Sequence, residues 1–185
     1  MNRYSAGILL YRFKNGKLEV MLVHSGGPIW AKKDIGTWSI PKGLPEKNEK
    51  LLDTAKREFE EETGFGVEGE FIDLGEIYQP SRKIIHIWAL EKDMDVTHIV
   101  SNTFKLEWPR QSGKIQEYPE VDKADWFGIE LATEKIRKGQ KGFIDRLIEA
   151  ISSSNKEKYA DNRKYSDREK KPLIKEKKYK QTTLF

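Results

Sequence analysis

Three glutamates in residues 57–64, which read REFEEETG, have the types and spacing to bind a cation together. On a helix each residue advances by about 100°, so Glu58, Glu61 and Glu62 fall at roughly 0°, 300° and 40°. By the same count Glu60 falls near roughly 200° and faces away from them. Neighbouring carboxylates repel one another, and a multivalent cation removes that repulsion. The spacing therefore indicates a site for a hard divalent ion such as Mg²⁺ or Mn²⁺.

Two further residues are suited to support such a site. Arg57 precedes Glu61 by four residues, so the spacing favours a role in orienting carboxylates over a role in binding substrate. Gly43 has no side chain, so its backbone carbonyl is able to approach the same ion. A glutamate-rich turn taken alone is also typical of a solvated, salt-bridged helix face, and that alternative stays open at this point.

The elements that must position these residues follow from local patterns. Apolar spacing predicts a helix over residues 51–63, which Gly64 would end. Asn15-Gly16 between two apolar runs predicts a hairpin. Further strands are predicted at residues 4–11, 18–24, 38–40, 71–78, 83–90, 103–108 and 125–129, and further helices at residues 131–138 and 143–152.

The complete pattern resembles the Nudix box. Gly43, five residues, Glu49, seven residues and then residues 57–65 agree with that box at its defined positions, and Phe59 is the one mild departure. The preceding residues 38–43, WSIPKG, also resemble the approach to the box. The resemblance covers roughly residues 4–150. It implies an α/β class fold, specifically a Nudix-type α/β/α sandwich with a mixed β-sheet.

The resemblance also implies a hydrolase that cleaves a nucleoside diphosphate linked to another group. Glu58, Glu61 and Glu62 would be the ligands of Mg²⁺ or Mn²⁺, and Glu62 would be the one that exchanges roles with the general base. Glu49 and Arg57 would orient these carboxylates.

A later segment would supply the general base in a protein of this family. Residues 117–122, EYPEVD, are expected to form an acidic loop before Trp126. Glu120 is our first candidate for the base and Glu117 the second. A surface acidic loop without a catalytic role is the alternative for either residue.

Substrate recognition is less constrained by the sequence. Trp30 is a candidate for stacking a base, and Lys32, Lys33 and Lys42 are candidates for binding phosphates; the alternatives are a core tryptophan and solvated lysines. The loop that carries Trp30 resembles a bacterial branch of predicted NTP pyrophosphohydrolases. Substrates still open are a (deoxy)nucleoside triphosphate, a dinucleoside polyphosphate and an ADP-ribose-type nucleotide. A non-catalytic nucleotide- or RNA-binding module is the rival, although the intact glutamates favour an enzyme.

Charge is distributed unevenly along the 185 residues. Residues 155–185 hold eleven basic and five acidic residues, a net +6, which leaves about −2 for residues 1–154 out of the total of +4. We therefore expect one domain at residues 1–154 and a basic, flexible tail at residues 155–185. The final residues QTTLF resemble a peptide that docks on the DNA sliding clamp, which would use Gln181, Leu184 and Phe185. A solubilising basic tail is the alternative.

Composition limits the compartment and the chemistry. The chain has no cysteine, which excludes disulfides and thiolate metal sites. No apolar run approaches the length needed to cross a bilayer. Met1 leads almost directly into a predicted strand, so we expect no signal peptide. These features predict a cytoplasmic protein without a membrane partner, whereas a monomer and a homodimer fit the sequence equally well.

Overall fold

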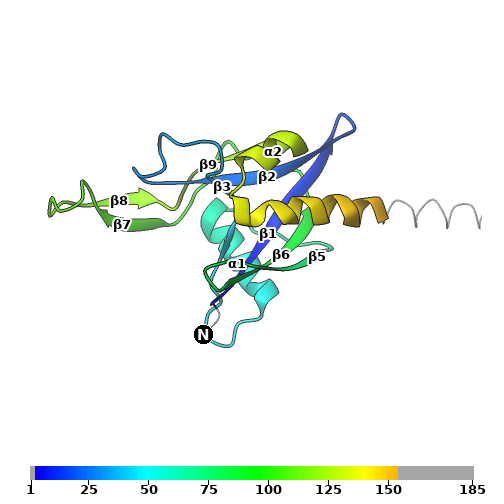
Figure 1. Cartoon of the computed structure of the whole chain (residues 1–185), viewed down its shortest axis with the longest axis horizontal. Coiled ribbons are helices and arrows are strands. Elements are labelled where there is room, and N and C mark those ends of the chain that lie inside the picture. The colour runs from blue at the N-terminus through cyan, green and yellow to red at the C-terminus, as the bar shows by residue number, and fades with distance from the viewer. Residues whose placement is uncertain (1–2, 154–185) are drawn as a thin grey trace, which may run out of the picture. The chain divides into compact units, whose positions relative to one another are not determined.

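The computed structural model describes residues 3–153, which form a mixed β-sheet with helices packed against it (Figure 1). A helix over residues 141–153 follows the elements named next. In chain order these are β1 (Arg3–Lys14), β2 (Lys17–Ser25), β3 (Trp38–Ser39), β4 (Lys42–Gly43), α1 (Leu51–Thr63), β5 (Ile72–Tyr78), β6 (Lys83–Glu91), β7 (Thr103–Glu107), β8 (Ile115–Pro119), β9 (Val121–Gly128), α2 (Ile129–Lys135) and the 3₁₀ helix η1 (Lys138–Gln140).

The main sheet is mixed because one of its central strand pairs is parallel. Its order is β3-β2-β1-β6-β5, with β4 paired to β1 and β9 paired to β2. β1 and β6 run parallel, and the other pairs of this sheet are antiparallel. β7 and β8 form a separate antiparallel hairpin. The expected α/β class with a mixed sheet is confirmed.

Local signals place the hairpin and the acidic helix where the sequence predicts them. Asn15 and Gly16 join β1 to β2 with φ angles of 52° and 74°, the left-handed conformation of a two-residue type I′ turn. α1 spans the predicted residues and ends at Gly64, whose φ is 80° and whose N–H donates to the Glu60 carbonyl. A glycine adopts this left-handed C′ conformation without the penalty that a Cβ brings.

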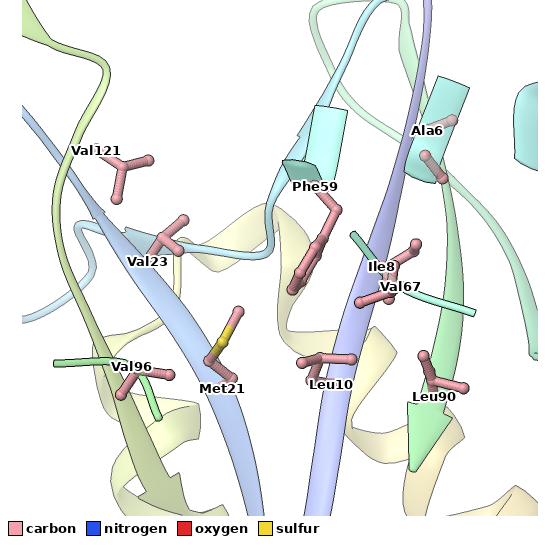
Figure 2. Close-up of a cluster of buried hydrophobic side chains, with 11 residues drawn as sticks. Ala6, Ile8, Leu10, Met21, Val23, Phe59, Val67, Leu90, Val96 and Val121 are labelled. Carbon is pink, nitrogen blue, oxygen red and sulfur yellow. The ribbon is translucent and has the colours of Figure 1, made fainter. Parts of the chain in front are cut away.

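One face of the sheet packs against α1 (Figure 2). Ile8 and Leu10 of β1 and Met21 and Val23 of β2 alternate toward that face, and Phe59 of α1 points into them with 0% exposure. Burial of Phe59 fixes the rotation of α1 about its axis. This rotation leaves Glu60 exposed, as predicted.

Residues 141–150 of the last helix cover the opposite face of the sheet (Figure 1). Leu9 and Leu22 alternate to that face and are fully buried. Phe143, Ile144 and Leu147 of the helix are also fully buried. With α1 on one face and this helix on the other, the predicted α/β/α sandwich is confirmed.

Two predictions of secondary structure were wrong. Residues 117–122 are not a loop, because β8 ends at Pro119 and β9 begins at Val121, four residues earlier than predicted. The helix predicted over 131–138 is divided into α2 and η1, since Ile136 instead forms a parallel bridge with Trp38. The partner of β9 is β2 and the partner of Ile136 is Trp38, both about a hundred residues earlier, whereas β8 pairs with the neighbouring strand β7.

The predictions for the tail, including Gln181, Leu184 and Phe185, concern residues outside the described range, and so does the domain boundary near residue 154. Among residues 3–153, no helix combines the length and the apolar character needed to cross a membrane.

Candidate active site

Glu58, Glu61 and Glu62, which we call the acidic arc, lie on the side of α1 that faces β4. Glu58 and Glu62 are half-buried on that side, and the backbone of Lys42 hydrogen-bonds the Glu62 carboxylate. Glu61 lies at the margin of the arc, with a side chain that is 36% exposed. The helical spacing therefore separates Glu58, Glu61 and Glu62 from the solvent-facing Glu60, as the sequence predicts.

Gly43 leaves the space that the Glu58 carboxyl group occupies. A Cβ built at this position would overlap the Glu58 carboxyl group. Any other residue at position 43 would therefore displace Glu58 from the arc. The predicted approach of the Gly43 carbonyl to an ion stays a prediction.

Arg57 holds the carboxylates in place as a shared hydrogen-bond donor. Its Nε and Nη2 donate to the two carboxylate oxygens of Glu49 at 2.9 and 3.0 Å. Its Nη1 donates to Glu58 at 2.9 Å and to Glu61 at 3.2 Å, and Nη2 also donates to the Leu44 carbonyl at 3.0 Å. The Arg57 guanidinium lowers the pKa of Glu49 to about 2. The contacts expected of Glu49 and Arg57 as orienting residues are present.

The arc carries more negative charge than its surroundings neutralise. Burial raises the pKa of Glu62 to about 7, and the charges of Glu58 and Glu120 add to this effect while Lys42 opposes it. Burial also raises the pKa of Glu58, with Arg57 opposing the effect. Both carboxylates are therefore held where burial disfavours their charged form, a cost that a nearby positive charge reduces.

The structure separates the two candidates for the general base. Glu120 lies at the junction of β8 and β9, where its N–H donates to Asn102 at 2.8 Å and its carbonyl accepts from Gly26 at 2.8 Å. Its charge acts on Glu58 and Glu62, as the smallest of the named causes that shift the pKa of each. By contrast, the Glu117 carboxylate accepts a hydrogen bond from Thr103 on the exposed part of the β7–β8 hairpin. Of the two candidates, Glu120 is the one whose charge acts on the two half-buried carboxylates, and its role as the base stays a prediction.

The four candidate substrate-binding residues occupy different surroundings. Lys42 adjoins the arc, and its charge and that of Glu62 attract each other. Trp30 is half-buried and lines a pocket, so it is not a core residue. Lys33 lies over its ring, with Nζ 4.7 Å from the centroid. Lys32 is exposed, and within residues 3–153 no hydrogen bond or ion pair connects its side chain with the arc.

Arg137 is a residue at the site that the sequence analysis missed. Its Nη2 donates to the Ser25 hydroxyl at 2.8 Å, and its Cζ lies 5.0 Å from the centroid of the Trp30 ring. Burial lowers its pKa, an effect that the charge of Glu62 offsets. The Arg137 N–H donates to the Trp38 carbonyl at 2.9 Å, a pairing across about a hundred residues that leaves no local signal in the sequence.

The residues of the arc fit a hard divalent ion in their chemistry. Their side-chain donors are carboxylate oxygens, which Mg²⁺ and Mn²⁺ prefer, and Gly43 leaves the space in which Glu58 lies. As they lie, no three acidic or histidine side chains in residues 3–153 converge on one point. Arg57 donates to Oε1 of Glu58 and to Oε1 of Glu61, so the second oxygen of each carboxylate is not bonded to Arg57.

The sequence matches one family model. The model of the NUDIX domain matches residues 1–147. No curated protein matches the chain.

Solved structures share the fold at low sequence identity. The NUDIX domain of Shewanella oneidensis NrtR, complexed with ADP ribose, is 14% identical, with coverage of 82% of this chain and 89% of that one and a TM-score of 0.57. An Ap4A hydrolase of C. elegans is 18% identical, with coverage of 80% and 98% and a TM-score of 0.55. A mutT/nudix family protein from Listeria innocua is 18% identical, with coverage of 83% and 96% and a TM-score of 0.54.

Proposed function

This chain belongs to the Nudix family, and from that premise we propose that it is a metal-dependent pyrophosphohydrolase. The reaction is the attack of water on phosphorus in a substrate that contains a nucleoside diphosphate linked to another group. The observation that carries this proposal is the intact acidic arc, in which Glu58, Glu61 and Glu62 share one side of α1 beside Gly43. A module that only bound nucleotides would not need this concentration of half-buried negative charge.

The side chains of the arc have distinct proposed roles. Glu58, Glu61 and Glu62 would hold Mg²⁺ or Mn²⁺, which when bound neutralises phosphoryl charge and activates water. Arg57 and Glu49 position these carboxylates through the hydrogen bonds of Arg57. Glu120 accepts the proton of the attacking water.

The cations beside the arc are suited to the phosphate groups of the substrate. Lys42 and Arg137 both lie in the field of Glu62, one on β4 and the other just after α2. Each is half-buried, so its interaction with a phosphate is screened less than that of an exposed cation. We therefore assign the phosphate chain of the substrate to the space between these two residues and the arc.

The substrate class is a nucleotide with a phosphoanhydride bond. ADP ribose, bound by the NrtR domain, and Ap4A, named for the C. elegans hydrolase, share a nucleoside diphosphate unit with the nucleoside triphosphates. That shared unit is what the arc and its neighbouring cations would recognise. A cytoplasmic location, which suits these substrates, remains a prediction.

Two variants of α1 test the proposal as a matched pair. Glu61→Gln should lower turnover of the best substrate among ATP, a dinucleoside polyphosphate and ADP-ribose by more than about 100-fold, since loss of a supporting residue alone costs 10–100-fold. Glu60→Gln removes an acid from the solvent-facing side and should retain full activity. The assay is release of phosphate or pyrophosphate with Mg²⁺ or Mn²⁺. Full activity of Glu61→Gln would contradict the metal site, and nucleotide binding without turnover by the unchanged chain would favour the non-catalytic module.

A further inference from the structure

A small apolar pocket opens between the loop at residues 26–30 and β7. It has a volume of about 110 Å³ and is lined by that loop together with Phe104 and Leu106. The two sides are in close contact, since a Cβ built on Gly27 would lie 3.1 Å from Cζ of Phe104. The β7–β8 hairpin therefore forms one wall of this pocket, and the loop that carries Trp30 forms the other.

The lining of the pocket suits a flat ring. Its largest side chains are the aromatic rings of Trp30 and Phe104, and every lining side chain is apolar. An apolar cavity of about 150 Å³ is known to bind benzene, so 110 Å³ suits part of a planar heterocycle. Aromatic side chains bind such rings by stacking on their faces.

Two cations lie at the Trp30 wall of the pocket. The Lys33 Nζ and the Arg137 Cζ lie 4.7 and 5.0 Å from the centroid of the Trp30 ring. Ser25 holds Arg137 in this position through a hydrogen bond of 2.8 Å. A ligand whose ring enters the pocket and whose attached group is anionic would find both partners there.

A backbone hydrogen bond links the pocket to the junction of β8 and β9, where Glu120 lies. Gly26, which lines the pocket, donates its N–H to the Glu120 carbonyl at 2.8 Å. The charge of Glu120 in turn acts on Glu58 and Glu62. The backbone at the pocket is therefore one hydrogen bond from Glu120, the residue proposed as the general base.

We propose that this pocket binds the base of the nucleotide substrate, held by Trp30 and Phe104, with the phosphates directed past Arg137 toward the arc. The assignment of the ring to a substrate rests on the proposed function. It adds the β7–β8 hairpin to the substrate site. Base recognition would then depend on a segment that contributes no residue to the Nudix box.

A binding experiment without turnover tests the pocket. AMP and ribose 5-phosphate, which lacks the base, are titrated into the full chain and followed by two-dimensional NMR, which detects weak binding. AMP should bind at least about tenfold more tightly, because stacking on aromatic side chains favours a base by that order. Phe104→Ala should lower the affinity for AMP toward that for ribose 5-phosphate and leave the latter unchanged. Ile115→Ala, which truncates an apolar side chain 64% exposed on the same hairpin, should change neither affinity.

Leu106→Trp provides an independent test, in case Phe104→Ala alters the structure of the β7–β8 hairpin. Leu106→Trp keeps an apolar side chain but fills the pocket, so it should also abolish the preference for AMP. Equal binding of AMP and ribose 5-phosphate to the unchanged chain would overturn the proposal. A preference for AMP that survives both Phe104→Ala and Leu106→Trp would do so as well. If the chain prefers AMP but hydrolyses no nucleotide, the base-binding pocket is supported and the proposed hydrolase activity is refuted. If the chain hydrolyses nucleotides but does not prefer AMP, only the proposal for the pocket is refuted.

Discussion

Replacement of Glu49 by glutamine tests whether Arg57 stabilises the fold through charge. The Glu49 carboxylate receives two hydrogen bonds from Arg57, one from the Glu46 N–H and one from the Thr54 hydroxyl. A glutamine has the same shape and keeps one carbonyl acceptor. The substitution therefore removes the negative charge that faces the guanidinium and replaces one of the two acceptor oxygens with an NH2 donor.

The expected loss of stability follows from the pKa of Glu49. Its ordinary value of 4.5 is lowered to about 2 in the folded chain, which at about 1.4 kcal/mol per pKa unit corresponds to roughly 3.5 kcal/mol before screening. The side chains of Glu49 and Arg57 are 16% and 25% exposed, so solvent screens part of this attraction. We expect Glu49→Gln to lower the free energy of unfolding by about 1–2 kcal/mol at neutral pH.

The stabilisation that the charged Glu49 contributes depends on pH, and the direction follows from its lowered pKa. Because the folded pKa is the lower one, the charged form stabilises the fold above the unfolded value, and this contribution is lost as the pH falls from about 5 toward 2. We therefore expect the difference in the free energy of unfolding between the unchanged chain and Glu49→Gln, measured with urea, to be less than half as large at about pH 3 as at pH 7. Glu60→Gln, on the exposed side of α1, should stay within about 0.5 kcal/mol of the unchanged chain. A difference between the unchanged chain and Glu49→Gln that is independent of pH would refute the reasoning, because shape and not charge would then be its cause.

Three further substitutions test the site and its supports. Gly43→Ala should weaken Mn²⁺ binding by about tenfold or more without changing the circular dichroism, because the new methyl group displaces Glu58; unaltered Mn²⁺ affinity would show that Glu58 moves without cost. Gln140→Leu should cost about 1–3 kcal/mol in urea unfolding, because the buried Ile40 N–H loses its acceptor at 2.9 Å; stability equal to that of the unchanged chain would mean that another acceptor replaces it. Phe59→Ala should cost about 3–5 kcal/mol by cavity formation, whereas Phe13→Ala, at a position 48% exposed, is the control and should cost far less; similar losses for the two would contradict the assignment of Phe59 to the core.

The acidic helix could be predicted because its signals are local. The positions of Glu58 and Glu62 on one side of α1 depend on helical spacing, and the end of the helix depends on Gly64. The pairing of Arg57 with Glu61 also follows from their separation of four residues.

The strands β8 and β9 could not be predicted in the same way. Of the residues of β8, all but Tyr118 are exposed, so its sequence lacks the alternation that marks a half-buried strand. β8 exists because its backbone pairs with β7, and β9 because its backbone pairs with β2, about a hundred residues earlier. The pairing of β8 with β7 places Glu117 within a strand and Glu120 at the junction of β8 and β9. The sequence offered both as candidates for the base but did not show this difference in position.

The sequence by itself determined the chemistry of the arc, because side-chain types at fixed helical spacing decide which carboxylates lie together. Tertiary structure decided what stands around them. Arg137 reaches Ser25 and Trp30, and Phe104 reaches the loop at residues 26–30, only because distant segments are folded against each other. Such contacts are set by strand pairing and core packing over the whole domain, and no short stretch of sequence encodes them.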